Sequence, residues 1–461
     1  MMALSSLAKG EGLKLLARFA SGVDLKAMPS DIVAKAKACL LYGLAVGVAS
    51  METRPARLAA AALDLEYGND AGPSTRLVDG RRVAVGAAAF ANSALLHARV
   101  QEDAHPAGHM GVVVIPAALA VAERVDAAGD ELLAAIIAGY EIALRIGRDH
   151  AADLSNRGLR TTSSYGVFAA AATAARLMRL DEERTLHALA LAANLAGGLR
   201  EFVNAGSEEY PYQAGFAARN GISAASCAHQ HIEAASTSLD GAAGFFPAYG
   251  EPSRDYDRRL VDGLGAAFEM REITYKPFPA CQFLRSVIRG VLEVRARAPA
   301  AQLGAIVIRM NPFEADFFGV RHAGPYTTFS QTFMSAPFCA ALAWSAGKVT
   351  YRGMHEFNDA ALLRSVARIE IVSDAARPRY RPRLEIRCAD GASLDWEAAP
   401  DSDTFKLTWD AAVTMTHSLC DEIGISESRA AGFIRSVEGI CEGPGSIRSL
   451  MSYVSTMKRE S

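Results

Sequence analysis

Three histidines and two carboxylates lie close together in one short stretch of the chain. They are His97, Glu102, Asp103, His105 and His109. A Pro/Gly turn leads from this stretch into an apolar segment with helical spacing, and the free amide groups at a helix N-terminus favour anions and disfavour imidazolium. Titratable groups in such a place suit acid–base chemistry, so the sequence indicates His109 as the first candidate for proton transfer.

Two other interpretations of this stretch remain open from its residues. Short polar runs with Pro and Gly are common turns, in which His105 and His109 would only cap the helix or pair with the nearby carboxylates. The spacing of the two histidines also resembles a metal-binding pattern. However, a proline and a glycine between them interrupt the helix that would place both on one face. We therefore expect no metal ion and no other cofactor.

A second candidate is the lysine in the segment Tyr-Lys-Pro-Phe-Pro at residues 275–279. Lys276 is the only lysine between Lys37 and Lys348, in a chain whose basic residues are mostly arginine. Lysine suits a site better than arginine where a group must release a proton or act as a compact charge. The adjacent prolines would hold the backbone rigid, and partial burial would lower the pKa of the amine. The alternative is a solvated charge at a hinge, since most lysines are exposed.

The composition indicates a globular protein. The chain has 461 residues, 50% of them hydrophobic, and a formal net charge of −3, which argues against disorder and against a nucleic-acid partner. Its length allows two or three domains. The seven cysteines are scattered singly, which fits reduced thiols in the cytoplasm. The N-terminal residues lack the pattern of a signal peptide, and the longest apolar run, residues 39–51, is too short to span a membrane. We expect a cytoplasmic protein without a membrane partner.

The first part of the chain, up to about residue 271, has helical spacing almost throughout. The expected helices are Asp31–Ser50, Ala84–Leu96, Val112–Arg124, Gly129–Arg148, Ser164–Met178, Asp181–Ala196 and Gly215–Glu233. Several of them are apolar on nearly every side and rich in alanine, so they belong in a bundle core or at a subunit interface. We therefore expect a homodimer.

After residue 271 the pattern changes to strands interleaved with two helices. The expected strands are Ala305–Met310, Val366–Val372, Leu384–Cys388 and Ser393–Glu397, and the expected helices are Cys281–Arg297 and Thr332–Ser345. Helical spacing returns from Trp409 onwards. The simplest organisation is a mainly α protein, with a discontinuous helical domain made of residues 1–271 and 402–461 and an inserted α+β domain at residues 272–401.

Three segments together resemble the MmgE/PrpD family. They are residues 84–98, the His-Pro-x-x-His loop at 105–109 with the apolar helix after it, and the junction at 275–281. The family includes 2-methylcitrate dehydratase, cis-aconitate decarboxylase and iminodisuccinate epimerase, and the resemblance extends over nearly the whole chain. It implies a homodimer with a discontinuous helical domain, a smaller α+β domain and a metal-free active site between them. It also implies small polycarboxylate substrates and reactions that begin at the carbon next to a carboxylate.

The site residues of the family transfer only in part, and only His109 and Lys276 match directly. An Asp of the decarboxylase-like members falls on Val100, a Thr on Ala104, a His on Arg160, a Lys on Tyr210 and a Tyr near Ala315. These differences indicate a changed substrate. Arg160 would supply a bidentate clamp for a carboxylate, and Tyr210 would supply a phenol able to exchange a proton.

We therefore expect a lyase of the dehydratase or decarboxylase type that removes the proton next to a carboxylate of a small di- or tricarboxylate. The developing enolate needs concentrated positive charge in a water-poor cleft. The expected catalytic residues are His109 as base or acid, Glu102 or Asp103 to orient its ring, Lys276, and Tyr210 as a second proton carrier. The expected substrate-binding groups are Arg160, His105, Arg285, Arg321 and the amides at the start of the helix after Gly111.

Two alternatives remain open. If Tyr210 and His109 approach opposite faces of one carbon, the protein is an epimerase, a racemase or another isomerase of a polycarboxylate; approach to the same face favours elimination. The other alternative is a catalytically inactive paralogue that only binds a polycarboxylate. Such a binder would lose affinity when Lys276 or Arg160 is changed and would be indifferent to His109.

Overall fold

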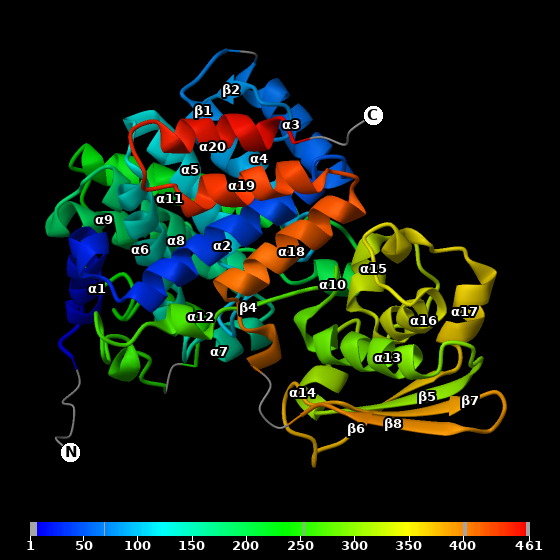
Figure 1. Ribbon diagram of the computed structural model, residues 1–461. Coiled ribbons are helices and arrows are strands. Elements are labelled where there is room, and N and C mark those ends of the chain that lie inside the picture. Colours follow the sequence, from blue (N-terminus) through cyan, green and yellow to red (C-terminus); the bar gives the residue numbers. More distant parts are fainter. Residues whose placement is uncertain (1–6, 69, 252–253, 400–402, 458–461) are drawn as a thin grey trace.

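The computed structural model describes residues 7–68, 70–251, 254–399 and 403–457, and Figure 1 shows a large helical body joined to a smaller body that contains a sheet. Helices from both ends of the chain build the large body, where α18 packs against α2. Its helices are α1 (Glu11–Gly22), α2 (Ser30–Ala49), α3 (Arg54–Tyr67), α4 (Val85–His97), α5 (Gly111–Val125), α6 (Gly129–Gly147), α7 (Ala151–Asn156), α8 (Thr161–Leu177), α9 (Glu182–Ala193), α10 (Phe202–Ala205), α11 (Tyr210–His229), α12 (Phe245–Tyr249), α18 (Trp409–Glu422), α19 (Glu427–Glu438) and α20 (Ser446–Ser455).

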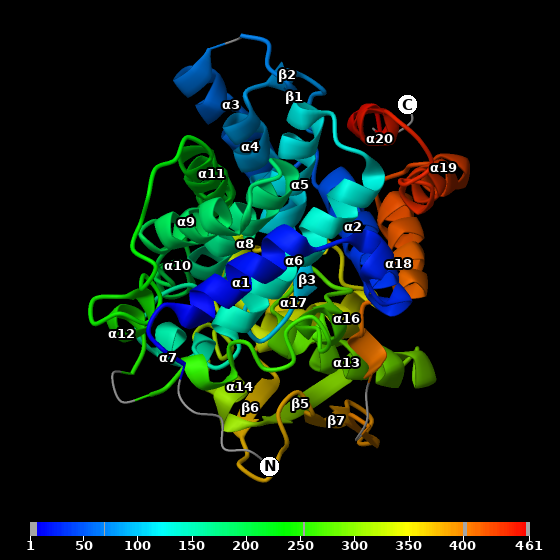
Figure 2. The ribbon, with the colours of Figure 1, turned by 90° about the vertical axis from the view of Figure 1, so that its left-hand side faces the viewer.

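Helix α8 lies at the centre of the large body. It packs against α1, α5, α6, α9 and α11, as Figure 2 shows. Its run of four alanines, residues 169–172, is fully buried. Small side chains let neighbouring helix backbones approach closely, which is why a helix with little amphipathic character forms here.

The smaller body is a four-stranded sheet covered by helices on one face (Figure 1). The strand order is β6-β5-β7-β8; β5 pairs with β6 in parallel, and the other pairs are antiparallel. Helices α13 and α16 pack together over this sheet. The elements are α13 (Arg285–Arg297), β5 (Leu303–Met310), α14 (Pro312–Ala315), α15 (Phe329–Met334), α16 (Ala336–Ala346), α17 (Ala360–Val366), β6 (Ile369–Ser373), β7 (Arg383–Cys388) and β8 (Ser393–Glu397).

Two short two-stranded ribbons lie outside this sheet. Strand β1 (Ser74–Thr75) pairs with β2 (Arg82–Val83), and β3 (Asp103–Ala104) pairs with β4 (Thr274–Tyr275). The second ribbon matters for the site, because it joins segments that are far apart in the sequence.

The mainly α character with a smaller α+β part is confirmed, and all seven helices expected before residue 271 are present with shifted ends. Two local predictions after that residue were wrong. The helix expected at Thr332–Ser345 is divided at Ser335, whose hydroxyl accepts a hydrogen bond from the amide of Phe338 at 3.0 Å and so starts α16. Strand β6 begins three residues later than expected, because Val366 ends helix α17.

The described residues form two apolar cores. One joins buried side chains between Leu13 and Ile273 with others between Leu407 and Met457. The second gathers side chains mainly between Ala280 and Cys388. The division into a helical domain, residues 1–271 and 402–461, and an inserted α+β domain, residues 272–401, stays a proposal; Ile273 packs in the first core, and residues 400–402 lie outside the described residues.

Helix α2 is long and apolar enough, by length and composition, to cross a membrane, and it is the only described helix of this kind. It is longer than the apolar run recognised in the sequence, because residues 30–38 continue the same helix. Within the fold, 78% of its most apolar window is buried. It packs against α4, α5, α6, α18 and α19, as a core helix does.

The close contact between α8 and α11 predicts that Gly221→Ala destabilises the protein. A Cβ atom at residue 221 would lie 2.5 Å from both the Cβ of Ala170 and the carbonyl oxygen of Val167. Overpacking of this kind costs about 1–3 kcal/mol of unfolding free energy, measured by urea denaturation. Gly22→Ala is the control, because nothing lies within 4 Å of a Cβ there. Equal stabilities of the two variants would contradict the prediction.

Candidate active site

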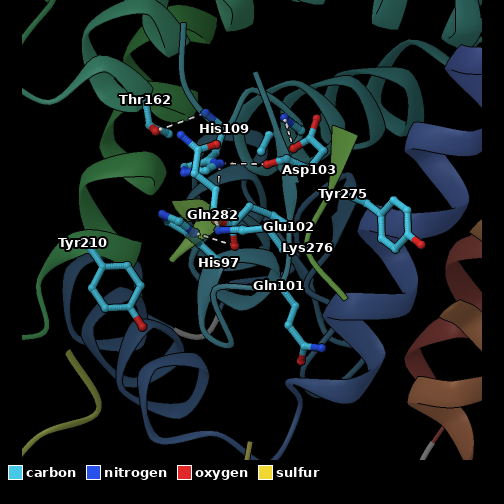
Figure 3. A network of polar contacts seen from close by, with 12 residues as sticks. His97, Gln101, Glu102, Asp103, His109, Thr162, Tyr210, Tyr275, Lys276 and Gln282 are labelled. Carbon is cyan, nitrogen blue, oxygen red and sulfur yellow. Dashed lines mark hydrogen bonds and ion pairs between the residues drawn. The ribbon is translucent and has the colours of Figure 1, made fainter. Parts of the chain in front are cut away.

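The β3–β4 ribbon brings the two candidate stretches of the sequence together. Asp103 faces Tyr275 and Ala104 faces Thr274 in antiparallel register, so Glu102 comes beside Lys276. The hydroxyl of Tyr42, on α2, donates to the carbonyl oxygen of Lys276 at 2.7 Å and also lies against that of Gln101. These backbone contacts place both side chains at the junction of the two bodies (Figure 3).

Glu102 is the centre of a buried network of charged and polar groups (Figure 3). Its Oε1 accepts a hydrogen bond from Nζ of Lys276, and the two side chains are only 2% and 1% exposed. Its Oε2 lies 3.1 Å from Nδ1 of His97, and Oε1 lies 3.6 Å from Nδ1 of His109. Burial favours the protonated acid, but His97 and Lys276 outweigh burial and hold the pKa of Glu102 well below its usual range. The carboxylate is therefore ionised.

His109 is held in one tautomer by a main-chain atom. Its Nδ1 lies 2.8 Å from the carbonyl oxygen of Asp103, and a carbonyl oxygen only accepts, so Nδ1 carries the proton. The amide of His109 donates to Oγ1 of Thr162 at 3.2 Å. No described residue contacts Nε2 with a hydrogen bond, and the ring lines a cavity. Burial, together with the charge of Lys276, lowers the pKa of His109 to about 3, so the ring is neutral near pH 7.

His97 links Glu102 to an arginine on the other side. Arg160 donates from Nη2 to Nε2 of His97, which therefore has its proton on Nδ1, toward Glu102. Burial lowers the pKa of His97 to about 4. Arg160 also donates from Nη1 to the side-chain oxygen of Gln213 at 3.0 Å and to the carbonyl of Tyr210. Burial lowers the pKa of this guanidinium to about 10, which still leaves it charged. No carboxylate of the described residues is ion-paired with it.

Asp103 was a candidate to orient the ring of His109, but its carboxylate binds other groups. Its Oδ2 accepts from the hydroxyl of Tyr140 at 2.7 Å, and its Oδ1 accepts from the amide of Gly111 at 3.1 Å. Burial raises the pKa of this carboxyl group to about 6. The first amide of α5 is thus used by Asp103, and it is the carbonyl oxygen of Asp103, not its carboxylate, that orients His109. A Cβ at residue 111 would lie 2.7 Å from Oδ1, which explains the glycine.

Tyr210 and His105 both line the cavity, but their polar atoms are engaged. The hydroxyl of Tyr210 donates to the carbonyl of Ala98 at 3.1 Å, and burial raises the pKa of the phenol well above its ordinary value. In Figure 3 this hydroxyl points away from His109. Nδ1 of His105 accepts from the amide of Ala107 at 3.1 Å, and Nε2 lies 3.7 Å from Glu269. This geometry favours positioning roles for both.

Arg285 and Arg321 do not reach this cavity, contrary to the sequence-based expectation. Arg285 is buried beside β4, where it donates to the hydroxyl of Thr274 and the carbonyl of Tyr275, each at 2.8 Å. Arg321 is 44% exposed and pairs with Asp316 at 2.9 Å. The two arginines line smaller pockets that adjoin this cavity, since the pockets share lining residues such as Arg148 and Phe317 with it. Their positions follow from the packing of the second body, which no local pattern in the sequence indicates.

The cavity has a volume of about 680 Å³ and is lined by residues of both bodies. Five basic and two acidic side chains reach it. The basic side chains are Arg148, Arg160, Arg200, Lys276 and Arg379, and the acidic ones are Glu102 and Asp316. The sequence did not single out three of these arginines, because arginine is common in this chain. Within the residues that the structure describes, no three His, Cys, Asp or Glu side chains are grouped so as to hold a metal ion.

The backbone conformation at position 100 is unusual for the valine found there. Val100 lines the cavity and has a φ of 56°, a region that β-branched residues rarely adopt. Asp adopts this conformation more readily, and Asp is the residue that the resemblance places there. Val100 thus has a backbone conformation that suits Asp better than Val, and its side chain brings no polar group to the cavity.

Comparison with known proteins supports the family resemblance. Residues 14–256 match the MmgE/PrpD N-terminal domain. Cis-aconitate decarboxylase of Aspergillus terreus is 28% identical over 299 residues, which is 62% of this chain and 60% of that protein. The cis-aconitate decarboxylase-like protein oryM of Aspergillus oryzae is 32% identical over 205 residues, 42% of each chain. Human cis-aconitate decarboxylase is 27% identical over 293 residues, 58% of this chain and 57% of the human protein.

The hydrogen bonds of His109 predict its NMR signature. In ring-labelled protein, the imidazole nitrogens should show the neutral tautomer with the proton on Nδ1, and this form should persist from pH 8 to pH 5 because the pKa is lowered to about 3. The His109→Asn variant assigns the signals, and N-acetylhistidine amide is the reference. A proton on Nε2, or protonation near pH 6.5, would contradict the assignment.

The buried ion pair predicts strong coupling between Glu102 and Lys276. Glu102→Gln should cost about 3–5 kcal/mol of unfolding free energy, because it leaves the ammonium group buried without its counter-ion. The double variant with Lys276→Met should cost clearly less than the sum of the single variants, as measured by urea denaturation. Asp126→Asn, which breaks an exposed pair with Arg448, is the control, with an expected cost of about 0–1 kcal/mol. Additive costs would contradict the coupling.

Proposed function

Because this chain belongs to the MmgE/PrpD family, we propose that it is a lyase that acts on a small di- or tricarboxylate by removing the proton next to a carboxylate. The matched segments span about 60% of the Aspergillus terreus decarboxylase, 57% of the human protein and 42% of oryM. The proposed activity is therefore argued from the site of this chain. The observation that carries the proposal is the free Nε2 of a neutral His109, which faces a cationic cavity beside the buried Lys276–Glu102 pair.

His109 is suited to take up a proton only when an anion is bound. In the empty site, burial and the charge of Lys276 lower its pKa to about 3, which makes the ring a weak base. Substrate carboxylates would offset the charge of Lys276 and so raise the pKa toward the range where proton transfer is efficient. The carbonyl of Asp103 keeps the proton on Nδ1, so the lone pair of Nε2 stays available for the substrate proton.

Lys276 and Arg160 would stabilise the charge that develops on the substrate. When the C–H bond breaks, the proton moves to Nε2 of His109, and the electron pair moves into the adjacent carboxylate as an enolate. Lys276 is partly neutralised by Glu102, whereas Arg160 has no ion-paired carboxylate among the described residues. For a dehydration, this electron pair would then expel hydroxide from the β-carbon, and the hydroxide would take up a proton and leave as water. For a decarboxylation, no C–H bond would break first: the C–C bond to a carboxylate would break, carbon dioxide would leave, and the electron pair left on the carbon would take up a proton. The names of the relatives favour a decarboxylase, and the dehydratase stays the other form of the proposed lyase.

The geometry does not favour the epimerase alternative. Proton exchange on both faces of a carbon requires a second acid or base, and Tyr210 was the candidate for this role. Its hydroxyl donates to the carbonyl of Ala98, and its pKa is raised well above the ordinary value. Tyr210 packs its ring against His97 at 5.1 Å instead. We therefore propose that Tyr210 forms part of the pocket wall.

The homodimer and the cytoplasmic location of the protein stay predictions.

The proposal predicts that His109→Ala abolishes turnover. The purified protein is incubated in D2O with citrate, 2-methylcitrate, cis-aconitate, malate, tartrate and iminodisuccinate, and proton NMR follows loss of the α-proton signal and gain of vinyl signals. Loss of general acid–base catalysis should reduce the rate about 100- to 10,000-fold. His229→Ala, an exposed position at the end of α11, should retain the wild-type rate. A wild-type rate in His109→Ala, or an inactive panel with intact binding, would exclude the proposed lyase.

A further inference from the structure

The cavity has two ends of different chemistry. At one end are the polar side chains of His109, Lys276 and Arg160, which suit carboxylate groups; Lys276 and Arg160 are buried, and His109 is 20% exposed. At the other end, the lining is mainly aromatic and belongs to the second body. A volume of about 680 Å³ is in the range for drug-sized ligands, and a small tricarboxylate held at the polar end leaves the aromatic end unfilled.

The aromatic end is built from four phenylalanines. They are Phe283, Phe313, Phe317 and Phe318. Phe283 lies 4.9 Å from Phe317 and 5.5 Å from Phe313 between ring centroids, in edge-to-face geometry, so the rings form one contiguous surface. Phe313 and Phe318 are 40% and 49% exposed although they lie at a cavity. Contiguous exposed aromatic surface in a concave site is typical of a surface that a ligand covers.

The charged groups at this end are already engaged. The guanidinium of Arg200 lies 5.0 Å and 5.1 Å from the ring centroids of Phe317 and Phe318, and that of Arg379 lies 3.9 Å from the centroid of Phe313. Stacking on rings keeps these side chains flat against the wall. Asp316, which also lines this end, is paired with Arg321 at 2.9 Å. The aromatic end therefore suits an uncharged, apolar group.

We propose that the substrate carries an apolar substituent, an alkyl or aryl group several carbon atoms long, that binds against the phenylalanines of the aromatic end. This inference rests on the proposed function for the carboxylate end of the substrate. The polar end holds the reacting carbon beside His109, and the aromatic end selects acids with a hydrophobic tail over unsubstituted polycarboxylates.

The test is the affinity of unreactive saturated acids for the full chain, measured by calorimetry. The series is succinate, butylsuccinate, benzylsuccinate and a succinate whose chain of equal length ends in a carboxylate. Complete burial of one methylene group strengthens binding about fourfold, so the four carbon atoms of the butyl group set an upper limit of about 250-fold over succinate. With partial burial we expect butylsuccinate to bind about 30-fold more tightly than succinate. Equal affinities, or tightest binding of the chain that ends in a carboxylate, would overturn the inference.

Two matched variants locate the effect. Phe318→Ala should remove most of the gain for butylsuccinate and leave succinate binding unchanged. Phe216→Ala is the control, because Phe216 is 47% exposed, lies under an arginine at 5.2 Å and is outside the cavity. A gain that survives Phe318→Ala unchanged would overturn the inference.

The same series separates the inference from the proposed function. Lys276→Met should weaken the binding of every acid in the series by a similar factor. One outcome would remove the proposed lyase and keep the apolar subsite. In it, butylsuccinate still binds more tightly than succinate, but Lys276→Met does not weaken binding and no acid exchanges its α-proton in D2O. If no acid of the series binds, both fail.

Discussion

The buried ion pair between Glu102 and Lys276 is the interaction on which the rest of the site depends. Two charges taken out of water are tolerated only when their geometry and their remaining hydrogen bonds are satisfied. Here the β3–β4 ribbon and the hydroxyl of Tyr42 fix the backbone on both sides of the pair. The segments before and after the pair, which carry the histidines, are held in register by the same contacts. Stability of this junction and assembly of the site therefore have one physical cause.

The pair also sets the protonation of its neighbours. Arg160 donates to His97, His97 directs its Nδ1 proton toward Glu102, and Lys276 donates to the other oxygen of Glu102. Cations on both sides, together with burial, keep the two histidines neutral. A site prepared in this way is cationic when empty, and an anionic ligand changes the basicity of His109 by its own charge. In the proposed reaction, binding of the anion and proton transfer to His109 are therefore coupled without a conformational change.

The cavity joins two parts of the chain that contribute different properties. The large helical body contributes the imidazoles and Arg160, whereas the second body contributes the aromatic wall around α14. Lys276, directly after β4, and its partner Glu102 lie where the chain crosses between the two bodies. Substitutions in the aromatic wall therefore change the shape of the pocket without removing the imidazoles or Arg160. Val100, in the loop before β3, has a φ of 56°, which is unusual for a β-branched residue.

The sequence by itself determined the helices, most strands and the two best candidates for the site. Helical and strand spacing report which face of an element is buried, and this is a local property. His109 was recognisable from its turn and Lys276 from its isolation among arginines. Only the tertiary structure decided that the carbonyl of Asp103 orients the imidazole and that Arg321 lies outside the cavity. These outcomes depend on which atoms from distant segments meet, and on the register of a two-residue ribbon, neither of which is encoded in the spacing of nearby residues.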